Sequence, residues 1–170
     1  DGGNASIVIF TTLLGGMVGV IGKSGGTRGI VERLKPYATN ARRGQLATWA
    51  LGVLIFFDDY ANSLLVGASM RPVTDRLRIS REKLAFIVDA TAAPVASLAL
   101  ISSWIGVEVG YIADQFEHLG IERDAYLTFI ETIPFRFYPI LMLLFVFWVG
   151  FRGRDFGPMR RAEERSLAQG

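Results

Sequence analysis

Four long apolar runs, separated by charged segments, set the pattern of this chain. An α-helix needs roughly 20 mainly apolar residues to cross the hydrocarbon core of a bilayer, and each run is near that length or longer. The pattern therefore predicts an all-α membrane protein with multi-pass transmembrane helices. The runs lie at residues 5–22, 45–70, 84–107 and 126–151.

The charged segments between the runs differ in sign. Residues 23–44 hold six Lys or Arg against one acid, residues 71–83 hold five against two, and the tail 152–170 is also basic. Residues 108–131 carry six acids against one Arg. Because basic connections stay on the cytoplasmic side, we expect the three basic segments to be cytoplasmic and 108–131 to be external.

This assignment constrains the second run. Residues 45–70 are flanked by two cytoplasmic segments, so the run cannot cross the membrane once. We expect a re-entrant hairpin of two pieces, 45–57 and 61–70, each about half a bilayer long. The sequence DDYANS, residues 58–63, would lie at its tip, where protein or a water-filled cavity must cover irregular backbone.

The third run is predicted to be a broken helix. It contains the sequence DATAAP, Asp89 to Pro94. A proline inside a helix removes one backbone hydrogen bond and leaves carbonyl groups free. We therefore expect the break near these residues, so that a hairpin tip and a broken helix meet near the middle of the membrane.

Composition supports the membrane assignment. Of the 170 residues, 51% are hydrophobic and 20% charged, and the mean hydropathy is +0.34. The net charge is only +2, and basic residues do not form one stripe, which argues against nucleic-acid binding. The absence of cysteine excludes disulfides and thiolate metal sites. The first residues, DGGNAS, lack a basic leader region, and we expect the chain to be part of something larger.

Asp58 and Asp59 are the leading functional candidates. A carboxylate in hydrocarbon is costly, and two adjacent ones cannot both ionise cheaply unless a proton or a cation is held there. Asn62 and Ser63 add neutral oxygen atoms that suit a hard ion such as Na⁺. The structural alternative is that the aspartates only cap the second half of the hairpin.

Asp89 and Thr91 are the second set of candidates. Both lie near the expected break, where free carbonyls could join an ion site. The alternative for Asp89 is a structural ion pair with an arginine of the basic segment, Arg71, Arg76 or Arg81. Glu108, at the outer end, is expected to be an exposed surface carboxylate, and Trp104 to anchor the chain at a membrane interface.

Residues 56–112, FFDDYANSLLVGASMRPVTDRLRISREKLAFIVDATAAPVASLALISSWIGVEVGYI, closely resemble the NhaC-type sodium/proton antiporters. That group includes sodium-lactate/malate-proton exchangers, and flanking stretches extend the resemblance over nearly the whole chain. It implies a multi-pass inner-membrane transporter without a cofactor, of which this chain is a fragment forming a partial transporter domain. The resemblance also implies that Asp58, Asp59, Asn62, Ser63, Asp89 and Thr91 contribute to the ion site.

The expected function is Na⁺/H⁺ antiport across the bacterial inner membrane, with Na⁺ held by Asp58, Asp59 and Asp89. The expected partners are the lipid bilayer and the transported ions, and association into a homo-oligomer is left open. One alternative is a sodium- or proton-coupled exchanger of carboxylates or amino acids. A remote alternative, an intramembrane aspartyl protease, lacks the Gly-x-Gly-Asp motif that such enzymes carry.

Overall fold

The computed structural model describes residues 35–169 continuously. Before them it describes only residues 5, 8, 9, 12, 13, 16, 19, 20, 23–25, 29, 32 and 33. The predicted first span, residues 5–22, therefore lies outside the continuous part.

Within residues 35–169 every regular element is a helix. This agrees with the all-α prediction. The α-helices are α3 (Ala41–Leu54), α4 (Asp59–Arg76), α5 (Arg81–Leu98), α6 (Ser103–Leu119), α7 (Ala125–Thr132), α8 (Phe137–Arg152) and α9 (Gly157–Gln169), and two short 3₁₀ helices are η1 (Lys35–Tyr37) and η2 (Ile133–Phe135).

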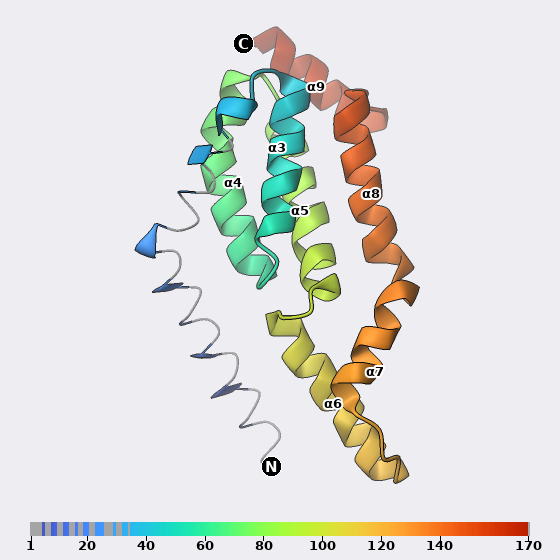
Figure 1. Ribbon diagram of the computed structural model, residues 1–170. Coiled ribbons are helices and arrows are strands. Elements are labelled where there is room, and N and C mark those ends of the chain that lie inside the picture. Colours follow the sequence, from blue (N-terminus) through green and yellow to red (C-terminus); the bar gives the residue numbers. More distant parts are fainter. Residues whose placement is uncertain are drawn as a thin grey trace.

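Helix α5 is the centre of the bundle. It packs against α3, α4 and α8, and α3 also contacts α4 and α8 (Figure 1). Helices α6 and α7 pack against each other and extend away from these four (Figure 1). The main core lies between α3, α4 and α5, and it includes Leu51, Val66, Met70 and Val88.

Side-chain caps explain where the helices begin. Five helices are preceded by a residue whose side chain accepts a hydrogen bond from the backbone N–H three positions later. This bond satisfies one of the donors that the first turn of a helix leaves unpaired. These residues are Asn40, Asp58, Ser80, Ser102 and Asp124.

The expected helix break lies elsewhere in the structure. Helix α5 continues through Pro94 to Leu98, and the interruption is at residues 99–102, after which α6 leaves at an angle of 43°. The prediction of a break near DATAAP was therefore wrong in position. Two serine hydroxyls supply hydrogen bonds to backbone carbonyls at the end of α5. Ser97 donates to Pro94 O (2.9 Å) and Ser102 donates to Ala96 O (2.7 Å).

Two other predicted segments also differ in extent. Helices α3 and α4 have 14 and 18 residues. At 1.5 Å per residue they measure about 21 and 27 Å, longer than half a bilayer each. The last predicted run is interrupted at η2 and Arg136, so that α7 and α8 are separate helices.

The two ends of the bundle differ in charge. The start of α3, the α4–α5 connection and α9 lie at one end, whereas the α6–α7 connection lies at the other (Figure 1). The first three belong to basic segments and the last to the acidic one.

Length and composition alone give modest evidence of membrane spans. Among the described residues, only the stretch Phe137–Ala168, which joins α8 and α9, is long and apolar enough to cross a bilayer by itself. The bent pair α5–α6 would make a second if it counts as one span.

Candidate functional site

Asp58 and Asp59 lie at the turn between α3 and α4. Helix α3 ends at Leu54, and Asp58 precedes α4 in an extended conformation, with φ at −158°. The Oδ1 atom of Asp58 accepts a hydrogen bond from Ala61 N at 2.8 Å. Asp58 therefore caps α4, which is the structural alternative considered from the sequence, while Asp59 is the first residue of the helix.

The beginning of α6 supplies further contacts to both carboxylates. Ser103 Oγ donates to Asp58 Oδ2 at 3.0 Å, and Trp104 Nε1 donates to Asp59 Oδ1 at 3.3 Å. The Ser103 backbone N–H also donates to Phe57 O at 3.0 Å. The α3–α4 turn is thus tied to the first turn after the α5–α6 break.

The carboxylates open onto a shared cavity of about 380 Å³. Both aspartates are half-buried, and Glu108, one turn further along α6, also lines this cavity. Asp59 Oδ2 receives no hydrogen bond within the described part of the chain. We call the set Asp58, Asp59, Ser103, Trp104 and Glu108 the α4–α6 carboxylate cluster.

Glu108 is not the exposed surface carboxylate that the sequence led us to expect. Its side chain is 31% exposed and forms an ion pair with Arg136, whose side chain is 20% exposed. Arg136 Nη1 also donates to Ser97 O at 3.0 Å, and its guanidinium lies 4.7 Å from the centre of the Phe129 ring. Arg136 therefore links α5 and α6 across the break.

Asn62 is buried below the aspartates and acts on the backbone. Its side-chain nitrogen donates to Gly52 O at 2.6 Å and Ile55 O at 2.8 Å, two carbonyls at the end of α3. Its Oδ1 atom has no hydrogen-bond partner among the described residues. The contacts of Asn62 hold the α3–α4 turn together, and they leave one buried oxygen atom without a donor.

Thr91 of α5 packs against Gly52 of α3. Its hydroxyl donates to Ile87 O at 2.8 Å and Val88 O at 3.1 Å. A Cβ atom placed on Gly52 would lie 2.3 Å from Thr91 Oγ1, so only glycine fits opposite this side chain. These contacts indicate that Thr91 serves the packing of α3 against α5.

Asp89 and Ser63 face a different cavity. They line a groove of about 470 Å³ between α4 and α5, together with Arg71 and Arg81. Asp89 is exposed, and Arg81 pairs with Asp75 at 3.6 Å. No ion pair joins Asp89 to any arginine in the described part of the chain, in contrast to the structural alternative considered above.

The predicted residues therefore fall into separate places. Asp58 and Asp59 share one cavity, Asp89 and Ser63 share another, and Asn62 and Thr91 are buried between helices. In the part of the chain that the structure describes, no three His, Cys, Asp or Glu side chains group so that they could hold a metal ion. A cation held jointly by Asp58, Asp59 and Asp89 stays a prediction.

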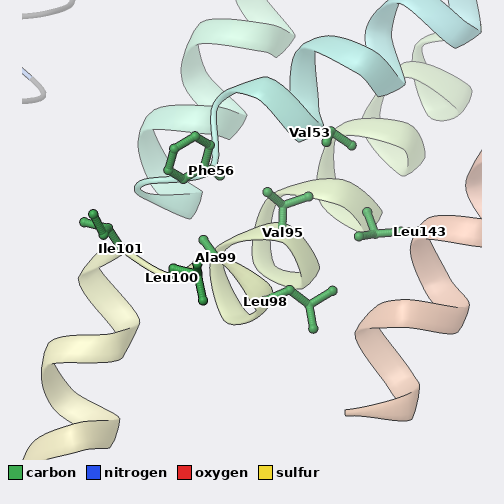
Figure 2. A pocket seen from close by; sticks show the side chains of 8 residues that line it. All are labelled: Val53, Phe56, Val95, Leu98, Ala99, Leu100, Ile101 and Leu143. Carbon is green, nitrogen blue, oxygen red and sulfur yellow. The ribbon is translucent and has the colours of Figure 1, made fainter. Parts of the chain in front are cut away.

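An apolar pocket lies next to the break in the bundle. It has a volume of about 450 Å³ and is lined by α3, the end of α5, the connection to α6, and α8 (Figure 2). Figure 2 shows Phe56 and Val53 above this pocket and Leu100 and Ile101 on the connection itself. The pocket holds no polar side chain, so it offers space around the break and no ligand for an ion.

The sequence reasoning missed Ser103, Trp104 and Arg136. Ser103 and Trp104 lie 45 residues after the aspartates they contact, inside an apolar run. Ser102 and Ser103 together were a signal, because paired serines before an apolar stretch are typical of a helix N-terminus.

Part of the chain is similar to a known protein family. Residues 95–169 match the model of the Na⁺/H⁺ antiporter family. The C-terminal part of the chain is therefore similar to a family of membrane transporters. It covers Ser103, Trp104, Glu108 and Arg136, and it begins after Asp89.

One relative covers almost the whole chain. An uncharacterized protein of Haemophilus influenzae is 35% identical over 165 residues, which are 96% of this chain and 32% of that protein. The chain thus spans about a third of the length of this relative. No solved structure matches the chain.

Proposed function

We propose that this chain forms part of an NhaC-type secondary transporter of the bacterial inner membrane that exchanges Na⁺ for H⁺ at the α4–α6 carboxylate cluster. The observation that carries the proposal is the pair of half-buried aspartates, which share a cavity with a third carboxylate and contact the first turn after a helix break. The family match supports the class of reaction, and the site assignment is our own.

The two aspartates would have different roles. Asp58 Oδ1 is used by the α4 cap and Oδ2 by the Ser103 hydroxyl, so Asp58 has little capacity left. Asp59 receives only the long contact from Trp104 and keeps Oδ2 free among the described residues. Asp59 is therefore the carboxylate that would bind Na⁺ or H⁺. Asp58 would stabilise the α3–α4 turn and keep a negative charge next to Asp59.

Competition couples the two ions. A cation next to Asp59 lowers its affinity for a proton, and a bound proton removes the charge that attracts the cation. Because Ser103 and Trp104 lie directly after the break, a change in the angle between α5 and α6 would change the contacts of the carboxylates. Such a change would give the alternating access that a transporter requires.

Asp89 has a separate place in the proposal. It would bind a cation that enters through the groove between α4 and α5, with the Ser63 hydroxyl as a second oxygen ligand. Arg71 in the same groove favours a second candidate function, exchange of a small carboxylate, because a guanidinium can bind a carboxylate through two hydrogen bonds.

The test is ion exchange in everted membrane vesicles that contain the protein expressed from its natural reading frame. We expect Asp59→Asn to abolish the Na⁺-dependent collapse of an imposed pH gradient. Asp58→Asn should reduce it while keeping α4 capped, since Asn is as good a cap as Asp. Asp114→Asn, on the exposed surface of α6, is the matched control and should behave as wild type.

Binding can be followed by the fluorescence of Trp104. Replacing Trp49, Trp148 and every tryptophan outside residues 1–170 by Phe leaves Trp104 as the reporter, because residues 1–170 contain three tryptophans. Addition of Na⁺ should change its emission, and Asp59→Asn should remove the change. Wild-type exchange in both aspartate variants would refute the site, and exchange that depends on an added carboxylate would favour the second candidate.

A further inference from the structure

Another polar cavity lies at the basic end of the bundle, away from the carboxylate cluster. It has a volume of about 710 Å³ and lies between the first turn of α3, the α4–α5 connection and α9. Arg42, Arg78 and Arg154 are among the residues that line it. We call it the basic-end cavity.

Two of the three carboxylates that line this cavity are paired with cations, and the third, Glu163, accepts only from a neutral backbone N–H among the described residues. Asp155 pairs with Lys83, and Glu164 accepts from Arg160 at 2.8 Å. Glu163 accepts from the backbone N–H of Ser80 at 2.8 Å.

Three guanidinium groups consequently remain without an acidic partner. No carboxylate pairs with Arg42, Arg78 or Arg154 in the part of the chain that the structure describes. The first turn of α3 also contains no acidic residue, so the positive end of this helix dipole is not offset. The basic-end cavity therefore has an excess of positive potential that suits an anion.

The wall of the cavity also contains an unsatisfied acceptor. Gln45, in the first half of α3, lines the cavity and is only 4% exposed. Its Oε1 atom has no hydrogen-bond partner among the described residues. A buried carbonyl without a donor is destabilising, so a ligand that carries a hydroxyl would relieve this cost.

An apolar surface leads from α8 to this cavity. Arg42 stacks over the Phe151 ring with 4.4 Å between the guanidinium carbon and the ring centre, and Arg152 lies 4.7 Å from the Trp148 ring. Phe151, Trp148 and Leu144 are all at least 44% exposed and share one face of α8. Arg42 and Arg152 thus lie against an exposed apolar stripe on α8.

From this combination we propose that the basic-end cavity binds an anionic glycerophospholipid. The headgroup phosphate contacts Arg42 and Arg154, a headgroup hydroxyl donates toward Gln45, and an acyl chain lies along Leu144, Trp148 and Phe151. A soluble phosphate would use the arginines and would leave the apolar stripe uncovered. The proposal requires only that the chain lies in a membrane, and it is independent of which ion is transported.

The test is native mass spectrometry of the protein expressed from its natural reading frame, purified in a non-ionic detergent and mixed with defined lipids. We expect phosphatidylglycerol to remain bound at least tenfold more than phosphatidylcholine. The double variant Arg42→Gln/Arg154→Gln should lose this preference. The control Arg76→Gln/Arg161→Gln removes the same charge from exposed residues outside the cavity and should keep it.

Two further arms distinguish a bound lipid from a bound soluble anion and from general charge attraction. Inorganic phosphate at millimolar concentration should not displace phosphatidylglycerol, and Phe151→Ser should weaken lipid retention. Equal retention of both lipids by the wild-type chain would overturn the proposal without any variant. Equal loss in the two double variants would show general charge attraction, and displacement by inorganic phosphate would show a soluble-anion site; either result overturns the lipid assignment.

Discussion

The buried pair of Lys83 and Asp155 gives the sharpest test of how this bundle is held together. Lys83 is in the first turn of α5, and Asp155 lies in the connection between α8 and α9. Their side chains are 1% and 11% exposed. The pair faces an apolar pocket of about 370 Å³ that includes Phe86 and Phe156.

Removal of one partner should be far worse than removal of both. Lys83→Met leaves the largely buried Asp155 carboxylate without its ion-pair partner, which costs about 3–5 kcal/mol. Since each 1.4 kcal/mol is a factor of ten, the unfolding equilibrium should shift by roughly two to three and a half powers of ten. The double variant Lys83→Met/Asp155→Leu replaces both charges by apolar groups and should recover most of this loss.

The assay is reversible unfolding in mixed micelles of increasing SDS content, followed by tryptophan fluorescence. Trp49 is a suitable reporter because its Nε1 donates to Leu143 O at 3.1 Å, across α3 and α8. The control is Arg123→Met, which breaks an exposed ion pair with Glu131 and should cost no more than about 1 kcal/mol. If Lys83→Met costs no more than the control, water screens the Lys83–Asp155 pair and the reasoning is wrong.

Two further predictions concern the contacts of α3. Gly52→Ala places a Cβ atom 2.3 Å from Thr91 Oγ1, so it should destabilise the bundle by about 1–3 kcal/mol in the same unfolding assay. Addition of Thr91→Ala should restore part of the loss, whereas Gly110→Ala, with nothing within 4 Å, should be neutral or slightly stabilising. Asn62→Leu removes the donors to Gly52 O and Ile55 O and should cost at least about 2 kcal/mol, because two buried carbonyls lose their partners. In Asn62→Leu the backbone amides of residues 55–58 should exchange hydrogen faster than in the control variant Ser63→Ala. Equal exchange in the two variants would contradict the role of Asn62.

The sequence predicted the location of the α3–α4 turn well and the helix break poorly. Asp58 and Asp59 interrupt an apolar run between two basic segments, so the local pattern alone points to a turn there. Pro94 is a misleading signal, because a helix can continue through a proline when neighbouring groups satisfy the freed backbone. The true break at residues 99–102 lies within an apolar stretch and has no strong sequence signal beyond Ser102 and Ser103.

Contacts between distant residues could not be predicted from one sequence. Lys83 and Asp155 are 72 positions apart, and Glu108 and Arg136 are 28 apart. In the sequence each looks like an ordinary charge in a connecting segment or near the end of an apolar run. Only the packing of α5 against α8 and the bend at α6 bring these partners together.

The attachments of α5 have a consequence for how the bundle can move. Lys83 fastens its first turn to the connection after α8, and Arg136 fastens its last turn through Ser97 O. These points are 14 residues apart, which is about 21 Å along a helix. Sites so far apart contribute additively to stability, so losing one fastening leaves the other at full strength. Loss of either contact should therefore weaken only that end of α5 and leave the contact at the opposite end in place.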